Sequence, residues 1–236
     1  MANSPPMSVT EATIKRISYR RFLNKPVSEQ DVRGILDKAR FAPSGGNTQP
    51  WHCYVLAGEA KAKLTKAILK NAAKPSKAEY RMYPGKKDMP KDMFDVYMKR
   101  RRTLASEMYR LMGVSYDDKK GRAEAMMKNF DFFGAPVGII ITVDRPVDVN
   151  GWGHVGSFLQ TICLLAEERG MGTCLQEAFG NYPTIIYDEL NIPKDQILWC
   201  GIALGYPDMS EPVNSLRSER APVDDFAVFH GFTSKI

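Results

Sequence analysis

Apolar residues recur at helical intervals over residues 32–39, which predicts an amphipathic helix there. Pro43 forbids that helix from continuing, because proline lacks an amide hydrogen and its ring clashes with the preceding turn. Two helix starts are marked by a serine with an acid three residues later, since their side chains can bind each other's unpaired amides. These starts are Ser8 and Ser28, so the first helix should begin at about Val9.

The middle of the chain shows the same helical spacing. Residues 59–72 and 91–112 are expected to be helices. Residues 74–90, with three prolines and a glycine, are expected to be a loop between them.

Three apolar runs predict strands, at residues 51–57, 137–143 and 198–204. The first follows a cluster of turn residues and is expected to be a buried strand. Helical spacing over 155–166 predicts a long helix between the other two, and Gly170 should cap it. This mixed order, without an internal repeat or a flexible linker, indicates a single α+β domain spanning the whole chain.

Composition excludes several other classes. The 236 residues are 44% apolar and 25% charged, which does not fit a disordered chain, a collagen or a coiled coil. No apolar run approaches the roughly 20 residues needed to cross a bilayer, and residues 1–6 lack the features of a signal peptide. The four cysteines show no CxxC spacing, so we expect reduced thiols in a cytoplasmic protein.

Positive charge is concentrated in one segment. Residues 61–128 contain 19 Lys and Arg against 8 Asp and Glu, whereas the other residues contain 14 against 19. A basic surface of this kind can bind nucleic acid or an anionic substrate. Because the charges are spread over nearly seventy residues, we expect a solvated helical face instead.

Gly151-x-Gly153-x-x-Gly156 matches the fingerprint of a dinucleotide-binding turn, and Glu177 follows at about the expected distance. Seven residues separate the preceding strand from Gly151, however, and the fingerprint requires a tight turn. The three histidines have no partner at metal-ligand spacing, and no GxSxG motif is present, so neither a metal site nor covalent hydrolysis is predicted.

Arg16, Ser18 and Arg20 stand at alternate positions. If the chain is extended there, all three project to one side and form a cationic, hydroxyl-lined site suited to a phosphate. The segment 42–51 combines two glycines with several short polar side chains and ends at Pro50 before a strand. This composition favours a loop that holds a planar polar ligand.

These two segments carry a resemblance to the FMN-dependent nitroreductase superfamily. They read Arg16-x-Ser18-x-Arg20-x-Phe22 and Ala42-Pro43-Ser44-Gly45-x-Asn47-x-Gln49-Pro50-Trp51. The resemblance continues in order through residues 129–136, 172–176, 200–206 and 214–220, so it covers most of the chain. A basic helical insertion at about 75–128 is similar to that of bacterial nitroaromatic (nitrobenzoate-type) reductases.

The resemblance implies an FMN site. Arg16, Ser18 and Arg220 would bind the phosphate, with Ser218 at a position where many relatives have lysine. Arg20 would face the flavin edge where negative charge collects on reduction. The glycine-containing loop would line the ring and ribityl chain, partly from the partner subunit, and the stretch 176–178 would present a backbone amide to flavin N5. The implied cofactor-binding residues are Arg16, Ile17, Ser18, Arg20, Pro43, Ser44, Gly45, Asn47, Gln176, Glu177, Ala178, Ser218 and Arg220.

The resemblance also implies the fold and assembly. The family fold is an α+β sandwich, a mostly antiparallel sheet flanked by helices. Two chains form a homodimer by exchanging C-terminal arms, here at about 211–236. The glycines 151–156 would then start the long interface helix.

The implied activity is hydride transfer from NADH or NADPH, through flavin N5, to a nitroaromatic or quinone-like acceptor by a ping-pong mechanism. No catalytic side chain is required, since the cofactor carries the chemistry. Enone reduction and reductive dehalogenation are rival activities within the superfamily. Outside it, the alternatives are a Rossmann-type dehydrogenase using Gly151–Gly156 and a basic nucleic-acid-binding protein using residues 61–128. We expect a small aromatic acceptor and neither a nucleic-acid nor a membrane partner.

Overall fold

The computed structural model describes residues 7–80, 83 and 85–232. The elements run in the order α1 (Val9–Lys15), α2 (Glu29–Ala39), η1 (Gly45–Asn47), β1 (Trp51–Ala57), α3 (Gly58–Lys70), α4 (Lys91–Leu111), α5 (Lys119–Met127), η2 (Lys128–Gly134), β2 (Val137–Asp144), η3 (Arg145–Val147), α6 (Asp148–Glu168), β3 (Gly172–Gln176), η4 (Glu177–Asn181), α7 (Pro183–Leu190), β4 (Gln196–Gly205), η5 (Pro212–Ser215) and η6 (Val223–Asp225), where η denotes a short 3₁₀ turn.

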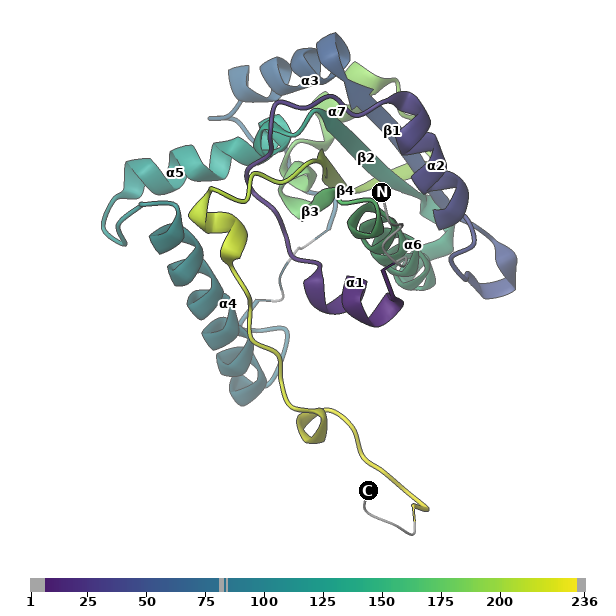
Figure 1. Ribbon diagram of the computed structural model, residues 1–236, viewed down its shortest axis with the longest axis vertical. Coiled ribbons are helices and arrows are strands. Elements are labelled where there is room, and N and C mark those ends of the chain that lie inside the picture. The colour runs from purple at the N-terminus through teal and green to yellow at the C-terminus, as the bar shows by residue number, and fades with distance from the viewer. Residues whose placement is uncertain (1–6, 81–82, 84, 233–236) are drawn as a thin grey trace, which may run out of the picture.

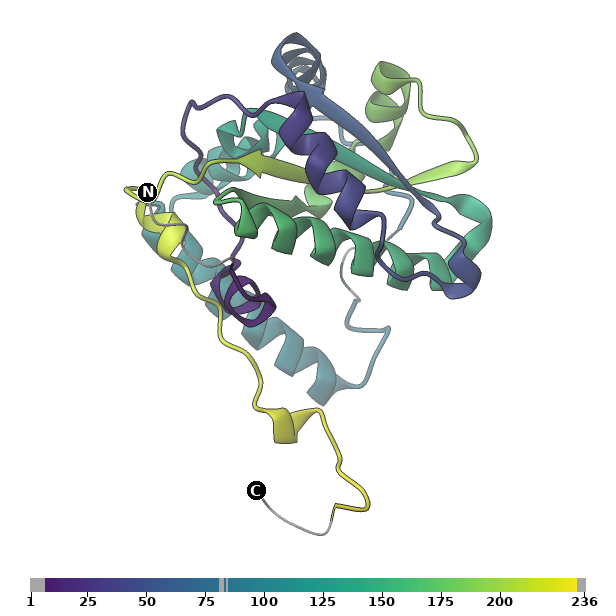
Figure 2. The same cartoon turned by 45° about the vertical axis from the view of Figure 1, so that its right-hand side comes forward.

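The strands form one antiparallel sheet in the order β1-β2-β4-β3. Successive side chains of β2 point to opposite faces, so Ile139 and Ile141 join one core cluster and Ile140 joins the other. Helices α2 and α6 cover the first face (Figure 2), and α3, α7 and the aromatic turn η2 cover the second. The expected α+β sandwich is confirmed.

Both serine-marked helix starts are confirmed. Ser8 accepts from the Glu11 amide at 3.1 Å, and Ser28 accepts from the Asp31 amide at 3.0 Å. In each case the acid side chain binds the amide of its serine in return. The long helix α6 ends as predicted, with Gly170 in the left-handed conformation at φ 69°.

The expectation that residues 51–57 form a buried strand is wrong in one respect. The strand is present as β1, but it lies at the edge of the sheet, and within the described part of the chain it pairs only with β2. Of its side chains only Leu56 is buried, and Val55 is 43% exposed. An apolar run predicts a strand without telling whether it takes a central or an edge position.

The motif Gly151–Gly156 lies inside α6 and not in a turn. The helix begins at Asp148, three residues before Gly151, and none of the three glycines has a positive φ. Their amides are therefore part of the helix and do not form a phosphate-binding turn. The interpretation of this motif as the start of the long helix is correct to within one turn.

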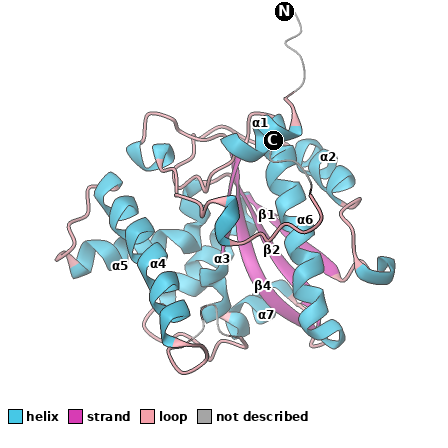
Figure 3. Ribbon diagram, turned by 90° about the horizontal axis from the view of Figure 1, so that it is seen from below, coloured by secondary structure: helices cyan, strands magenta, loops and turns pink. Residues whose placement is uncertain are grey.

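Two parts of the chain stand away from the sheet. Helix α4 buries none of its side chains, and α4 and α5 project to one side (Figure 3). The C-terminal segment runs out from the body (Figure 1) and exposes the large apolar residues Phe226, Val228, Phe229 and Phe232. Residues 233–236 of the predicted arm lie outside the described residues.

No helix within the described part of the chain is long and apolar enough to cross a membrane. The same residues contain no group of three His, Cys, Asp or Glu side chains that could hold a metal ion.

Candidate cofactor site

The segment after α1 is extended, as the alternation of its residues predicts. Ile17 and Tyr19 are buried, whereas Arg16, Ser18 and Arg20 are half-buried on the other side. Ser18 forms an isolated parallel bridge with Thr173 of β3, and the Tyr19 amide donates to the Thr173 carbonyl at 3.0 Å. The row of polar side chains therefore runs along the outer edge of the sheet.

Buried polar contacts fix this segment against α6. The Tyr19 hydroxyl donates to Glu167 Oε1 at 3.2 Å, and Lys15 Nζ lies 3.4 Å from the same oxygen. Glu167 is only 3% exposed, so its charge requires these partners. From the C-terminal segment, the buried Asn214 side chain accepts from the Arg20 amide at 2.8 Å.

The charges of Arg16 and Arg20 both influence Cys174, a buried residue of β3. Burial raises the pKa of the Cys174 thiol, while the nearby charges of Arg20 and Arg16 and a hydrogen bond from Ser18 oppose that rise. The alternating burial of residues 16–20 confirms the predicted extended segment, with Arg16, Ser18 and Arg20 on the side away from the core.

Two buried polar atoms at this edge have no hydrogen-bond partner among the described residues, namely Arg16 Nε and Gln176 Oε1. The Gln176 amide nitrogen donates to the Asn129 carbonyl at 2.7 Å, and this leaves Oε1 facing away. An unsatisfied buried donor or acceptor costs about 1–3 kcal/mol. A ligand bound here would have to offer an acceptor to Arg16 and a donor to Gln176 to satisfy both atoms.

Glu177 and Ala178 follow directly in η4. The Glu177 carboxyl is half-buried, and burial raises its pKa. The Ala178 carbonyl accepts from Asn181 Nδ2 at 3.1 Å. Phe179 supports this turn. Its ring is fully buried and packs so closely on Gly201 that a Cβ atom added at Gly201 would lie 2.4 Å from it.

The loop 43–49 is built on left-handed residues. Gly46, Asn47 and Gln49 have φ of 59°, 57° and 48°. Ser44 Oγ accepts from the Gln49 amide at 3.0 Å, and the Gly45 amide donates to the His154 ring with Nε2 at 3.2 Å. His154 lies near the N-terminal end of α6, so the loop is attached to that end.

The two halves of the predicted site are therefore not adjacent within one chain. Tyr19 contacts α6 at Glu167, and Gly45 contacts it at His154, thirteen residues earlier. At 1.5 Å per residue these contacts lie about 20 Å apart along the helix. The chain alone does not bring Pro43, Ser44, Gly45 and Asn47 to the arginine row.

In the C-terminal segment, Arg220 Nη1 donates to the Ser218 carbonyl at 2.8 Å, and the same group contacts Ser218 Oγ. Both residues are exposed. The described contacts do not join either of them to Arg16.

Arg217 is a neighbour of the arginine row that sequence reasoning missed. Its Nη1 donates to the carbonyls of Ile14 and Lys15 at 2.9 and 2.7 Å, at the end of α1 immediately before Arg16. Its charge also lowers the pKa of Tyr19, although burial dominates and raises that pKa to about 12. The available signal was that Arg217 directly precedes Ser218, where the resemblance leads one to expect a cation.

Comparison with known proteins identifies the family of the chain. Residues 14–206 match the Nitroreductase family. The chain is 39% identical over 217 residues to a 4-nitrobenzoate reductase of Pseudomonas putida, covering 92% of this chain and 93% of the relative. It is 35% identical to a chloronitrobenzene nitroreductase of Comamonas testosteroni, with 91% and 93% covered.

Among solved structures, an FMN and NADPH-dependent nitroreductase NfnB from Sphigopyxis sp. strain HMH superposes with a TM-score of 0.90. It is 32% identical in sequence, and the match covers 96% of this chain and all of that one. NfnB from Mycobacterium smegmatis, in complex with NADPH, has a TM-score of 0.84 at 26% identity, with 94% and 97% covered.

Proposed function

This chain belongs to the nitroreductase family, and on that premise we propose that it is an FMN-dependent enzyme that uses NADPH or NADH to reduce nitroaromatic compounds. The observation that supports the proposal most strongly is the pair of unpartnered buried atoms, Arg16 Nε and Gln176 Oε1, beside Arg20. The phosphate of a flavin mononucleotide could accept from Arg16 Nε. Its ring carries both donors and acceptors, so it could also donate to Gln176 Oε1.

The residues present fit the cofactor. Arg16 and Ser18 would hold the phosphate together with Arg217 or Arg220, because charge-assisted hydrogen bonds to phosphate are strong. Arg20 would lie at the edge of the ring, where its fixed charge stabilises the reduced cofactor. When bound, FMN supplies the atom that accepts and donates hydride, and these side chains bind and orient it.

We further propose that each site is built from two copies of the chain. The loop 43–47 lies about 20 Å along α6 from the arginine row, so a second copy has to supply it. Exposed positions of α6 recur at Gly153, Gly156 and Gln160, which is the spacing of one helix face. Small residues on such a face allow another helix to approach closely.

The C-terminal segment supports the same assembly. Four large apolar residues there are between 61% and 82% exposed in a single chain. Surface of this kind is normally covered by a partner. An arm that wraps the second copy would bury it, and the dimer would then complete two flavin sites.

Donor and acceptor would occupy one pocket in turn, which gives ping-pong kinetics. Quinones are a second acceptor class on the same mechanism, because an open ring face accepts flat, electron-poor molecules. A Rossmann-type dehydrogenase finds no support, since the glycines of its motif are inside a helix. No contact or site in the described residues favours nucleic acid over a small anion.

The test is anaerobic spectroscopy of the purified protein. We expect the absorption bands of oxidised flavin, bleaching by NADPH or NADH, and recovery on addition of a nitroaromatic. Initial rates at several acceptor concentrations should give parallel double-reciprocal lines. A colourless protein that cannot be reconstituted with FMN would remove the proposal, and intersecting lines would remove the shared pocket.

A further inference from the structure

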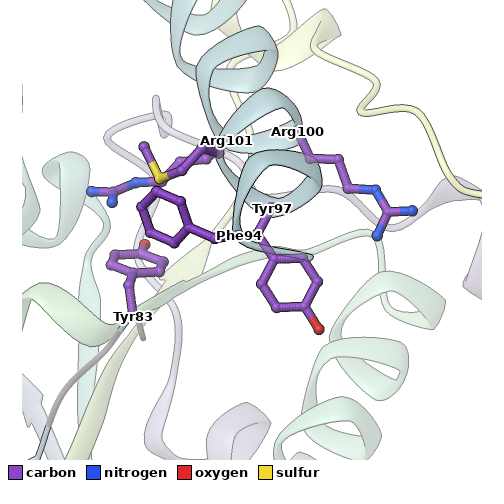
Figure 4. A pocket seen from close by; sticks show the side chains of 6 residues that line it. Tyr83, Phe94, Tyr97, Arg100 and Arg101 are labelled. Atoms are coloured by element: carbon purple, nitrogen blue, oxygen red, sulfur yellow. The ribbon is translucent and has the colours of Figure 1, made fainter. Parts of the chain in front are cut away.

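Lys61 differs from the other cations of the basic segment 61–128. Most of the described lysine and arginine side chains of that segment are exposed to solvent. Arg100 and Arg101 are examples, and Figure 4 shows them on α4 at a pocket lined by aromatic rings. The Lys61 side chain is only 14% exposed. A charge this far from solvent requires partners, so the contacts of its ammonium group show what the residue holds.

Lys61 and Thr65 bind the aromatic turn η2 from α3. The Lys61 Nζ donates to the Ala135 carbonyl at 2.8 Å and lies 3.2 Å from Asp131 Oδ1. Thr65 follows one helical turn later on the same face, and its Oγ1 donates to the Phe130 carbonyl at 2.8 Å. Helix α3 therefore holds the turn and the residue that follows it at three places, namely residues 130, 131 and 135.

The turn needs such support because its backbone is strained. Phe132 and Phe133 have φ of 52° and 54°, in the left-handed region that residues other than glycine rarely adopt. Conformations of this kind persist only where the surrounding contacts impose them. The Phe132 ring packs so closely on β2 that a Cβ atom added at Gly138 would lie 2.5 Å from it. This packing and the polar contacts from α3 together fix the turn.

The same turn determines how Gln176 is oriented. Asn129 directly precedes Phe130, and its carbonyl accepts from the Gln176 amide nitrogen at 2.7 Å. Gln176 is 2% exposed, and its Oε1 has no hydrogen-bond partner among the described residues. If the turn relaxed, the Asn129 carbonyl would move, and the Gln176 amide would lose the contact that fixes which way it points.

We propose that Lys61 and Thr65 are positioning residues for Gln176. By holding η2 they fix the Asn129 carbonyl, and that carbonyl keeps the Gln176 amide nitrogen engaged and its oxygen free to accept from a ligand. The inference rests on the proposed function, because the ligand is taken to be FMN. On this account the charge of Lys61 holds the main chain and does not attract an anion.

Fluorescence titration of the flavin-free full chain with FMN tests this relay of contacts. Lys61→Met and Thr65→Val remove the polar groups at nearly constant size. Each should weaken FMN binding roughly two- to tenfold, the value of one neutral hydrogen bond. Lys66→Met is the matched control, because it removes the same charge from an exposed position of α3, and its affinity should equal that of the unmodified protein. An equal loss in Lys66→Met, or no loss in the other two variants, would overturn the inference.

A double-mutant cycle separates positioning from a general effect on the fold. If Lys61 acts through Gln176, Lys61→Met should have almost no further effect on FMN affinity in a Gln176→Leu protein. Thr65→Val should behave in the same way, and it decides the question if Lys61→Met does not fold. Losses that add in full would mean that these residues act on the fold and not on Gln176, which overturns the inference.

NMR of the flavin-free full chain separates this inference from the proposed function, because it needs no cofactor. The side-chain amide signals of Gln176, identified by their loss in Gln176→Leu, should move or broaden after Lys61→Met and after Thr65→Val. They should stay in place after Lys66→Met. Moved signals in a protein that binds no FMN would support the positioning role and remove the proposed function. Unmoved signals in a protein that binds FMN and reduces nitroaromatics would do the opposite.

Discussion

The side-chain amide of Gln176 donates to the main-chain carbonyl of Asn129 at 2.7 Å, and this contact fixes which way the amide points. A carbonyl can only accept, so the amide nitrogen must face Asn129 and the amide oxygen must face away from it, where it has no partner among the described residues. The contact joins β3 to η2, where Phe132 and Phe133 both have a positive φ, of 52° and 54°. A strained turn therefore supports a residue of the candidate site.

Gln176→Glu should destabilise the protein because it places two acceptors face to face at Asn129. The expected loss in free energy of unfolding is about 1–3 kcal/mol near pH 8. At low pH the introduced carboxyl can hold a proton and donate it, so the loss should shrink. Gln176→Leu is the control without a titrating group. Denaturant unfolding at two pH values measures the difference, and a loss independent of pH would contradict the assignment of the amide.

Arg16→Ala should weaken FMN binding, and so should either Arg217→Ala or Arg220→Ala, whichever removes the second cation at the phosphate. One charge-assisted contact to phosphate is worth about 1.5–3 kcal/mol, which is roughly ten- to a hundredfold in affinity. Arg21→Ala is the matched control. It removes the same charge from the position after Arg20, on the opposite side of the extended segment from Arg16, Ser18 and Arg20. Its effect should stay within about 0.5 kcal/mol. Fluorescence titration of flavin-free protein measures all four, and unchanged affinity in Arg16→Ala would refute the phosphate site.

These assignments show which parts of the site a sequence can predict. The alternation at Arg16, Ser18 and Arg20 was readable because it depends only on the two-residue period of an extended chain. The capping boxes at Ser8 and Ser28 could also be predicted, because each is formed within four consecutive residues. Local rules therefore predicted α1, α2 and the polar row correctly.

Features that depend on packing between distant segments were not readable. The exposure of β1 follows from its place at the sheet edge, which its own composition does not determine. The contact of Arg217 with the end of α1 joins residues more than two hundred positions apart. The separation of the loop at Gly45 from the arginine row depends on where each meets α6, which only the structure shows.

Glu177 should make folding depend on pH. Burial raises the pKa of its carboxyl in the folded chain above its usual value. Ionising Glu177 therefore costs more free energy in the folded state than in the unfolded state. This penalty is absent below the unfolded-state pKa and grows as pH rises through the folded-state pKa. Glu177→Gln should therefore increase the free energy of unfolding near pH 7.5 and leave it unchanged near pH 4. The exposed Glu168→Gln serves as the control, and an equal gain at both pH values would show that charge is not the cause.

Removing residues 226–236 should weaken the dimer. Phe226, Phe229 and Phe232 are 72%, 61% and 77% exposed in one chain, and each would contribute very roughly 1.5–3 kcal/mol if a partner covered it fully. The shortened protein should dissociate on dilution and release flavin at the same time. Phe229→Ala alone should have a smaller effect in the same direction. Sedimentation velocity followed at a flavin wavelength tests this, and an intact, fully loaded dimer after truncation would contradict the wrapping arm.

The central claim, that each flavin site takes the arginine row from one chain and the loop from another, is tested most directly with mixed dimers. Arg16→Ala damages the row, and Gly45→Val damages the loop, because a Cβ atom added at Gly45 would lie 3.0 Å from His154 Nε2. In a mixed dimer of the two variants, one site would contain both changes and the other would contain neither. At an FMN concentration that leaves both parent dimers largely empty, the mixed dimer should regain up to half of the flavin content of the unmodified protein. Flavin content no higher than the average of the two parents would contradict the shared site.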